Sequence, residues 1–190
     1  MKPELRKQEL LEIAFRQFLQ QGYEKTSIRS IVGEADGEIG MFYHHFSSKE
    51  EIFTEVLEQY NAGYVEELRQ IINKESRVSF GELMERILSH LEGSLAEYRS
   101  MNSGSANKEV LALLHQKTLI SLKPIFCGIL HEYAGRGEIS PPETDIGLLT
   151  DFMLSGISAV LHNDSEKSMS EKRGTIRKLI IKLLEKAPEP

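Results

Sequence analysis

Apolar residues recur three and four positions apart along most of this 190-residue chain, and this helical spacing constrains the fold more than any other feature. Val, Ile and Thr never alternate with polar residues for long enough to indicate a strand. We therefore expect an all-α protein with about nine helices. The predicted helices cover residues 3–21, 28–35, 39–45, 47–73, 79–99, two segments between 108 and 134 with a break or kink at Pro124, 143–162 and 170–186.

Residues 26–46, TSIRSIVGEADGEIGMFYHHF, carry the most specific local pattern. Two short helices joined by a tight turn at Asp36 and Gly37 bury little apolar surface alone, so they need the first helix as a third partner. Such a three-helix arrangement holds one helix out for a major groove. The core candidates are Ile28, Ile31, Val32, Ala35, Phe42 and Phe46, and the residues left to point outward are Arg29, Tyr43, His44 and Lys49.

Lys49 follows two serines at a predicted helix start, where Ser47 and Glu50 have capping-box spacing. A cation in a first helical turn interacts unfavourably with the positive end of the helix dipole. A phosphate bound there would make the net interaction favourable, because helix N-termini attract anions. Lys49 is therefore either a phosphate ligand or a solvated surface lysine. Thr26, Ser27, Tyr43 and His44 are further donors of the kind that position a duplex by its phosphates.

The net charge of −6 argues against a broad basic surface for nucleic acid. Residues 1–49 hold seven bases and seven acids, so this segment is neutral and the remainder carries the negative charge. Phosphate binding would have to come from a few well-placed groups.

The amino-terminal segment resembles the TetR family of bacterial repressors. The matching motifs are Gly22-Tyr23, Thr26-Ser27-Ile28-Arg29-Ser30-Ile31, Gly40-Met41-Phe42-Tyr43-His44-His45-Phe46 and Ser48-Lys49-Glu50-Glu51-Ile52-Phe53. Beyond residue 60 the similarity is one of helical architecture only. The resemblance implies a helix-turn-helix DNA-binding domain at residues 1–47 and a helical ligand-binding and dimerisation domain at residues 48–190.

The resemblance also implies roles for individual residues. Thr26 and Ser27 would contact phosphate, the helix over residues 39–45 would enter the major groove, and Tyr43 and Lys49 would hold the DNA backbone. The full expected DNA-binding set is Thr26, Ser27, Arg29, Glu38, Ile39, Gly40, Met41, Tyr43, His44 and Lys49. A homodimer would bind a palindromic operator as a repressor and would leave it when a small-molecule effector binds.

The turn departs from the pattern that is usual in the family, because Asp36-Gly37-Glu38-Ile39 stands where the family has its glycine, a serine cap and a lysine. Asp36 tolerates a left-handed conformation. Asp36 or Glu38 must cap the third helix, and Glu is a poor cap. Glu38 could accept a hydrogen bond from cytosine or repel the duplex.

The helix predicted at 143–162 is apolar on all sides, so it must be buried on all sides, by its own core and by a second subunit. Small residues on it permit close approach. We expect the homodimer interface at Phe152, Ser155, Gly156, Ala159, Ile176, Leu179, Ile180 and Leu183. The alternative is a monomer with one large core.

An effector pocket is expected where polar groups stand among apolar residues of the middle helices. The candidates are Met84, Leu88, His90, Leu91, Tyr98, His115, Leu122 and Phe126. His90, His115 and His131 could together bind a metal, but they lack a tight ligand spacing. We expect no metal and no cofactor.

Other classes of protein fit less well. The chain has no HExxH, GxSxG, CxxC or glycine-rich phosphate loop, so we expect no enzyme. The lone Cys127, the absence of a signal peptide and the lack of a stretch of twenty apolar residues indicate a cytoplasmic protein without a membrane anchor. The neutral charge of residues 1–49, which we call the head, and the altered turn at Asp36-Gly37 leave one alternative open. The chain could be a helical protein-interaction module whose DNA affinity is weakened or lost.

Overall fold

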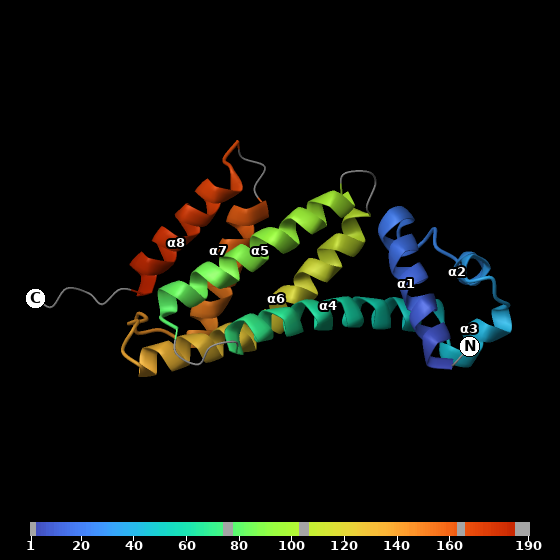
Figure 1. Ribbon diagram of the computed structural model, residues 1–190, viewed down its shortest axis with the longest axis horizontal. Coiled ribbons are helices and arrows are strands. Elements are labelled where there is room, and N and C mark those ends of the chain that lie inside the picture. Colours follow the sequence, from blue (N-terminus) through green and yellow to red (C-terminus); the bar gives the residue numbers. More distant parts are fainter. Residues whose placement is uncertain (1–2, 74–77, 103–106, 163–165, 185–190) are drawn as a thin grey trace, which may run out of the picture. The chain divides into compact units, whose positions relative to one another are not determined.

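The computed structural model describes residues 3–73, 78–102, 107–162 and 166–184, with the backbone alone at 94–102. These ranges contain helices and no strands, which confirms the all-α prediction (Figure 1). The eight helices, close to the nine expected, are α1 (Pro3–Gln21), α2 (Ile28–Glu34), α3 (Ile39–His45), α4 (Lys49–Asn73), α5 (Phe80–Asn102), α6 (Lys108–Gly135), α7 (Ile146–His162) and α8 (Met169–Leu184).

The helix α6 accounts for the difference in number. Pro124 lies inside it, and the helix continues to Gly135, so the two segments expected on either side of the proline are one element. A proline removes one backbone donor from the ladder. In α6 that loss does not end the helix.

The chain divides into two compact units. The first comprises Met1–Tyr64 and Tyr98–Lys117, and the second comprises Val65–Glu97 and Thr118–Pro190. Since α4, α5 and α6 each contribute residues to both, the units are linked by continuous helices. The domain boundary expected between residues 47 and 48 stays a prediction.

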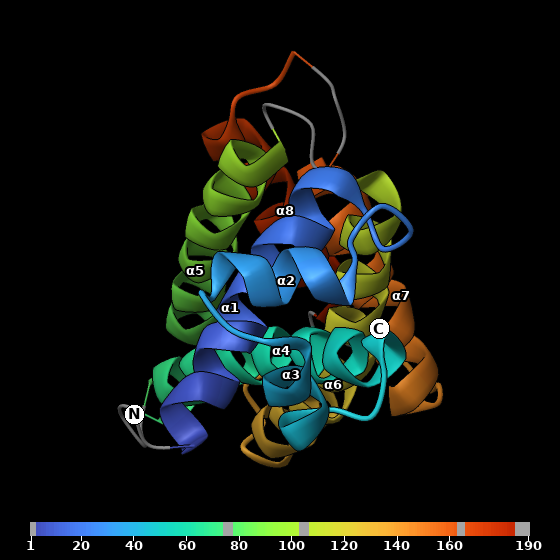
Figure 2. The same cartoon turned by 90° about the vertical axis from the view of Figure 1, so that its right-hand side faces the viewer.

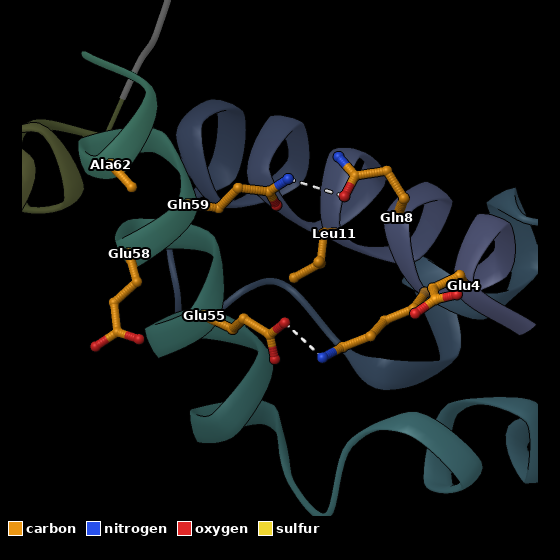
Figure 3. A pocket seen from close by; sticks show the side chains of 8 residues that line it. Glu4, Gln8, Leu11, Glu55, Glu58, Gln59 and Ala62 are labelled. Atoms are coloured by element: carbon orange, nitrogen blue, oxygen red, sulfur yellow. Dashed lines mark hydrogen bonds and ion pairs between the residues drawn. The ribbon is translucent and has the colours of Figure 1, made fainter. Parts of the chain in front are cut away.

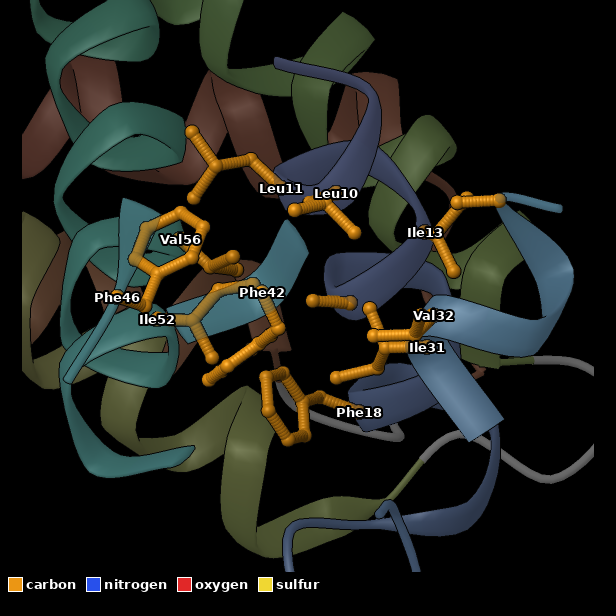
Figure 4. Close-up of a cluster of buried hydrophobic side chains, with 12 residues drawn as sticks. Leu10, Leu11, Ile13, Phe18, Ile31, Val32, Phe42, Phe46, Ile52 and Val56 are labelled. Carbon is orange, nitrogen blue, oxygen red and sulfur yellow. The ribbon is translucent and has the colours of Figure 1, made fainter. Parts of the chain in front are cut away.

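Buried side chains of α1, α2, α3 and the start of α4 form the core of the first unit (Figure 4). Burying one such side chain fully stabilises the fold by about 1.5–3 kcal/mol. The two seven-residue helices therefore depend on this shared core. Its members are Leu10, Leu11, Ile13, Ala14, Phe18, Ile31, Val32, Ala35, Phe42, Phe46, Ile52 and Val56.

A smaller cluster in the same unit joins the end of α1 to the start of α6. It consists of Leu19, Leu57, Val110, Leu111 and Leu114. The first unit is thus more than the three amino-terminal helices, because the first turns of α6 pack against α1 and α4.

The start of α4 is capped in a register one residue from the expected one. Ser48 Oγ accepts a hydrogen bond from the amide of Glu51 at 3.2 Å, and the Glu51 carboxylate accepts from the amide of Ser47 at 2.6 Å. Ser47 Oγ also donates to this carboxylate, and the side-chain and then the amide bond of Ser47 lower the pKa of Glu51. The predicted pairing of Ser47 with Glu50 is wrong, because Glu50 accepts from the Tyr23 hydroxyl instead.

In the second unit, α7 buries one face and exposes the other. Leu149, Thr150, Met153, Leu154, Ile157 and Leu161 are buried. On the opposite side Leu148 and Phe152 are 66% and 68% exposed. We predicted that this helix is apolar on all sides and buried on all sides. Within this chain one apolar face of α7 is buried in the core, and the other is exposed.

One helix, α6, is long and apolar enough by length and composition to cross a membrane. The sequence does not predict a helix that meets this test. In the second unit α6 buries Leu122, Phe126, Ile129 and Leu130, whereas Leu113 and Ile120 of the same helix are 46% and 67% exposed. Burial in the fold therefore accounts for only part of the apolar character of this helix.

Candidate nucleic-acid interface

The start of α2 is fixed by reciprocal hydrogen bonds. Ser27 is the N-cap, its Oγ accepts from the amide of Ser30 at 3.0 Å, and its own amide donates to Ser30 Oγ at 3.1 Å. Two amides that would otherwise lack partners at a helix start are thereby satisfied. The sequence singled out Ser27 as a phosphate ligand, and the structure gives this exposed residue a capping role as well.

The helix α2 is also tied to α1 along its length. Gln17 on α1 is buried, and its Nε2 donates to the backbone oxygen of Ser30 at 3.2 Å and to the Glu34 carboxylate at 2.7 Å. Arg16 adds an ion pair to Glu34. The Gln17 bond is the largest cause of the lowered pKa of Glu34. These contacts make α2 a rigid support for the turn that follows.

The turn between α2 and α3 uses Asp36, not Gly37, for its left-handed residue, with φ of 48° at Asp36. A Cβ at Gly37 would lie 2.2 Å from the Met41 methyl group, so a larger residue there would displace the end of this flexible side chain. Met41 therefore packs over the turn. The displaced glycine noted in the sequence is compatible with a tight turn, as expected from the tolerance of Asp for this conformation.

The helix α3 follows α2 after a short turn (Figure 2), and its exposed residues are both polar and apolar. Phe42 is fully buried, whereas its neighbour Tyr43 is 57% exposed and Ile39 is 41% exposed. Glu38 stands at the N-cap and makes no side-chain capping bond. Gly40 faces open space, because an added Cβ would meet no atom within 4 Å. Glu38 and His44 are exposed on the same short helix segment.

Residues 22–26 connect α1 to α2, and we call them the α1–α2 corner. Two expected phosphate ligands, Thr26 and Lys49, form hydrogen bonds to this corner instead. Thr26 is 1% exposed, and its hydroxyl donates to the Gly22 carbonyl at 2.8 Å. Lys49 Nζ donates to the carbonyls of Tyr23 and Thr26 at 3.0 and 3.2 Å and lies 4.1 Å from the Tyr23 ring centroid. These acceptors and the ring offset the unfavourable position of a cation at a helix start.

Tyr23 completes the α1–α2 corner. Its hydroxyl donates to the Glu50 carboxylate at 2.6 Å. Burial, followed by the hydrogen bond and charge of Glu50, raises the pKa of Tyr23 to about 12. The sequence could not assign this role, because nothing local to Tyr23 or Lys49 indicates that they meet.

The cations of the head differ in how they are used. Arg6, Lys7 and Arg16 form ion pairs with Glu9, Glu55 and Glu34. Among the residues described between 3 and 49, Lys25 and Arg29 form no ion pair, and both are exposed beside Ser27. Lys25 was not among the DNA-binding candidates that the sequence indicated. Its position four residues before Arg29 could have indicated that the two cations lie close to each other.

The predicted dimer residues separate into two groups. Phe152, Ser155, Gly156, Ala159 and Leu179 are exposed, and Leu183 is half-buried. Ile176 and Ile180 lie in the interior of the second unit, 2% and 5% exposed. These two isoleucines therefore pack inside their own subunit.

The predicted effector residues do not gather in one place. Met84, Leu88, Leu122 and Phe126 are buried in the second unit. Leu91 is half-buried there, and half-buried His90 lies 3.8 Å from the Glu67 carboxylate. Half-buried His115 belongs to the first unit, and the side chain of Tyr98 lies outside the described residues.

A cleft of about 360 Å³ lies in the first unit, between α1 and α4 (Figure 3). Two cross-links span it, the Lys7–Glu55 ion pair at 2.5 Å and a hydrogen bond from Gln59 to Gln8 at 2.8 Å. The cleft was not expected from the sequence. Within the described side chains, no group of three or more His, Cys, Asp or Glu could hold a metal ion.

The geometry defines the class of protein first. Two short helices joined by a tight turn, braced by a third helix and presenting the second outward, form a helix-turn-helix head. Residues 10–56 match the family described as bacterial regulatory proteins, tetR family. By its amino-terminal segment, the chain is similar to the TetR family.

Curated relatives match in the same region. The HTH-type transcriptional repressor KstR2 of Mycolicibacterium smegmatis is 40% identical over 58 residues, which cover 30% of this chain and 28% of that protein. KstR2 of Mycobacterium tuberculosis is 44% identical over 52 residues, or 27% and 26% of the two chains. The match thus spans little more than a quarter of these relatives.

Solved structures match over nearly the whole chain. The fatty acid degradation regulator FadR from Bacillus halodurans has a TM-score of 0.70 at 16% identity, over 92% of this chain and 94% of that one. A TetR-family transcriptional regulator from Agrobacterium tumefaciens has a TM-score of 0.64 at 16% identity, over 97% and 100%. At this identity the likeness establishes the fold.

Proposed function

We propose that this chain is a DNA-binding transcriptional regulator, a repressor that a small-molecule effector releases from a palindromic operator. The observation that carries the proposal is the exposed face of α3, held outward by α1 and α2 in a head that matches the TetR family. A helix so held can reach base edges in a major groove. The fold of known regulators over the remaining helices supports the same conclusion.

The contacts we propose fall into two groups. Ser27, Lys25 and Arg29, at the start of α2, approach phosphates, which fix register without reading sequence. The exposed α3 residues approach base edges, with Tyr43 also close to the backbone. Thr26 and Lys49 act indirectly, because both are engaged in the α1–α2 corner. The base-reading candidates are Glu38, Ile39, Gly40, Met41, Tyr43 and His44.

A second copy of the chain is the partner we propose for the open face of α7 and α8. Leu148, Phe152 and Leu179 are more than half exposed, and Ser155, Gly156 and Ala159 beside them permit close helix approach. A two-fold pair of heads calls for a palindromic site. Sedimentation of Phe152→Glu would test this face, since a buried charge at its centre should yield monomers.

The effector and its pocket are the least constrained part of the proposal. We place the pocket in the second unit, among Met84, Leu88, His90, Leu91, Leu122 and Phe126, in a cytoplasmic protein without cofactor or catalytic activity. Two heads that change spacing on effector binding would lose simultaneous contact with both half-sites. Protection of these residues from hydrogen exchange by a library of small molecules would test the assignment.

Selection of bound sequences from a random duplex pool is the decisive experiment. We expect an enriched palindrome, and half-sites about one helical turn apart or a multiple of it. Affinity for that duplex should fall steeply with salt, since phosphate contacts release counterions. A pool that stays unenriched at low salt would overturn the proposal.

Variants then separate the two kinds of contact. Lys25→Ala and Arg29→Ala should weaken binding to all duplexes alike and reduce the salt slope by about one each. Ile39→Ala and His44→Ala should instead change the selected sequence. Lys178→Ala, which removes an exposed cation on α8, is the matched control and should bind as the unaltered chain does.

A second candidate function is a helical protein-interaction module. It is favoured by the acidic groups at the turn, where Asp36 and Glu38 are both exposed and would lie near phosphates. Such a module should show almost no duplex binding at any salt concentration. Glu38→Gln discriminates further, because removing a repelled charge would raise affinity for random duplex.

A further inference from the structure

The end of α1 and the start of α6 meet at one residue, Asn107. Its backbone N–H donates to the Leu19 carbonyl at 2.7 Å. Its side-chain oxygen accepts from the amides of Glu109 and Val110, each at 3.1 Å. Asn107 therefore supplies a donor to the last turn of α1 and an acceptor to the first turn of α6, and both helices lack such partners at their ends.

The two helix ends that meet at Asn107 carry partial charges of opposite sign, so their electrostatic interaction is favourable. The carboxyl end of α1 carries partial negative charge and the amino end of α6 carries partial positive charge. Asn107 brings them together through neutral hydrogen-bonding groups. The apolar contacts of Leu19 with Val110 and Leu111 lie in the same cluster, so the junction is both polar and packed.

Gly22 provides the space for Asn107. It has φ of 87°, and an added Cβ would lie 2.3 Å from Asn107 Nδ2. The glycine that ends α1 thus serves two purposes, a left-handed backbone and close approach of the Asn107 amide. The sequence indicated only the first.

Hydrogen bonds from Asn107 and from Lys49 therefore hold the chain around the α1–α2 corner from two sides. The Asn107 N–H donates to the Leu19 carbonyl shortly before the corner, and Lys49 Nζ donates to the carbonyls of Tyr23 and Thr26. Ser27, the cap of α2, follows directly. Any shift of the corner moves the start of α2, and α3 moves with α2 through their shared core.

We infer that Asn107 is a positioning residue of the DNA-binding head. It fastens the α1–α2 corner to the first turn of α6, a helix that continues into the second compact unit. A displacement of α6 along its axis is therefore passed to α1 and α2 directly. Its consequence for DNA rests on the proposed function, whereas the junction itself can be measured in the free protein.

Three variants of the full chain test the inference. Asn107→Ala removes the α6 cap and the side-chain amide near Gly22 but keeps the backbone bond to Leu19, Asn107→Asp keeps the capping oxygen, and Ser79→Ala removes a comparable cap from α5 in the second unit. Hydrogen exchange of residues 19–31 and affinity for the selected duplex are measured for each.

We expect Asn107→Ala to speed exchange at residues 19–31 several-fold and to weaken duplex affinity roughly fivefold, as loss of one helix cap predicts. Asn107→Asp should restore both readouts, and Ser79→Ala should change neither. Unchanged exchange in Asn107→Ala, or equal effects from Ser79→Ala, would overturn the junction. Faster exchange without weaker binding would overturn the positioning role. If the unaltered chain binds no duplex, the proposed function fails, and exchange alone still decides the junction.

Discussion

The helices α2 and α3 have the same length, seven residues, and share one hydrophobic core, yet they differ in their polar contacts. In α2 the ends and the side are satisfied by polar partners, namely the Ser27–Ser30 cap and the Gln17 contacts. In α3 the N-cap Glu38 contributes no side-chain bond, and the helix is held by Phe42 and the following Phe46 in the core.

This difference agrees with the roles that we propose for the two helices, α2 as a support and α3 as the helix that reads DNA. A helix of seven residues is unstable alone, because nucleation costs more than so few bonds return. The supporting helix can use polar ties on both exposed ends. The N-cap of α3 makes no side-chain bond, and α3 therefore depends on the residues it packs against the core.

Removal of the buried anchor of α3 is expected to have the largest effect. Phe42→Ala should lower the free energy of unfolding by about 3–5 kcal/mol, because Phe42 is fully buried among α1, α2 and α4. Urea titration followed by circular dichroism measures the loss. The adjacent Tyr43→Ala, at an exposed position, should change stability by less than about 0.5 kcal/mol. Equal losses would mean that α3 does not depend on its buried face.

Removal of the α2 cap is expected to have the next largest effect. Ser27→Ala should cost about 1 kcal/mol, since it leaves the Ser30 amide without its acceptor. Ser27→Asp should retain most of the stability, because Asp caps as well as Ser. Thermal unfolding of the three proteins gives the comparison. A loss on Ser27→Asp as large as that on Ser27→Ala would point to a cause other than the cap.

Adding an N-cap side chain to α3 tests the same difference in the opposite direction, because α3 would then have the kind of cap that α2 has. Glu38→Ser should stabilise the chain by about 0.5–1 kcal/mol, because the N-cap of α3 makes no side-chain bond and Ser is a preferred cap. Glu38→Ala is the matched control and should be nearly neutral. Denaturant midpoints report both, and a Ser variant no more stable than the Ala variant would contradict the account of α3.

The sequence predicted the local elements closely where the signals are local. The bounds of α1 and α3 agree with the structure, since Pro3, Gly22 and the spacing of apolar residues mark them. The capping register of α4 was wrong because two serines and two glutamates stand in succession. Tertiary contact with Tyr23 decides between them by engaging Glu50.

The candidate site was less predictable, because its roles depend on distant partners. Thr26 and Lys49 are polar and stand in a motif, but Gly22 and Tyr23 engage them inside the fold. Likewise, the apolar face of α8 does not tell which residues meet their own core. Ile176 and Ile180 do, and Leu179 does not. Asn107 follows a polar segment and shows no sign of its contact with Leu19.

The smallest expected effect is a dependence of α3 on pH. Burial lowers the pKa of His45, the last residue of α3, and the charges of His44 and Lys7 lower it further. A base whose pKa is lower in the folded chain than in the unfolded one binds protons more strongly after unfolding. His45 therefore contributes stability above about pH 6.5, and this stability is lost as pH falls through the folded pKa.

We accordingly expect amides of α3 to exchange faster relative to those of α2 between about pH 7.5 and about pH 5.5, after correction for intrinsic rates. His45→Gln should reduce this change, whereas His131→Gln, at an exposed position on α6, should leave it as it is. The carboxyl end of α3 attracts a cation, which opposes the effect of burial. A ratio of exchange rates that stays constant over this range would show that the helix dipole cancels the effect of burial at His45, and that α3 is no more sensitive to acid than α2.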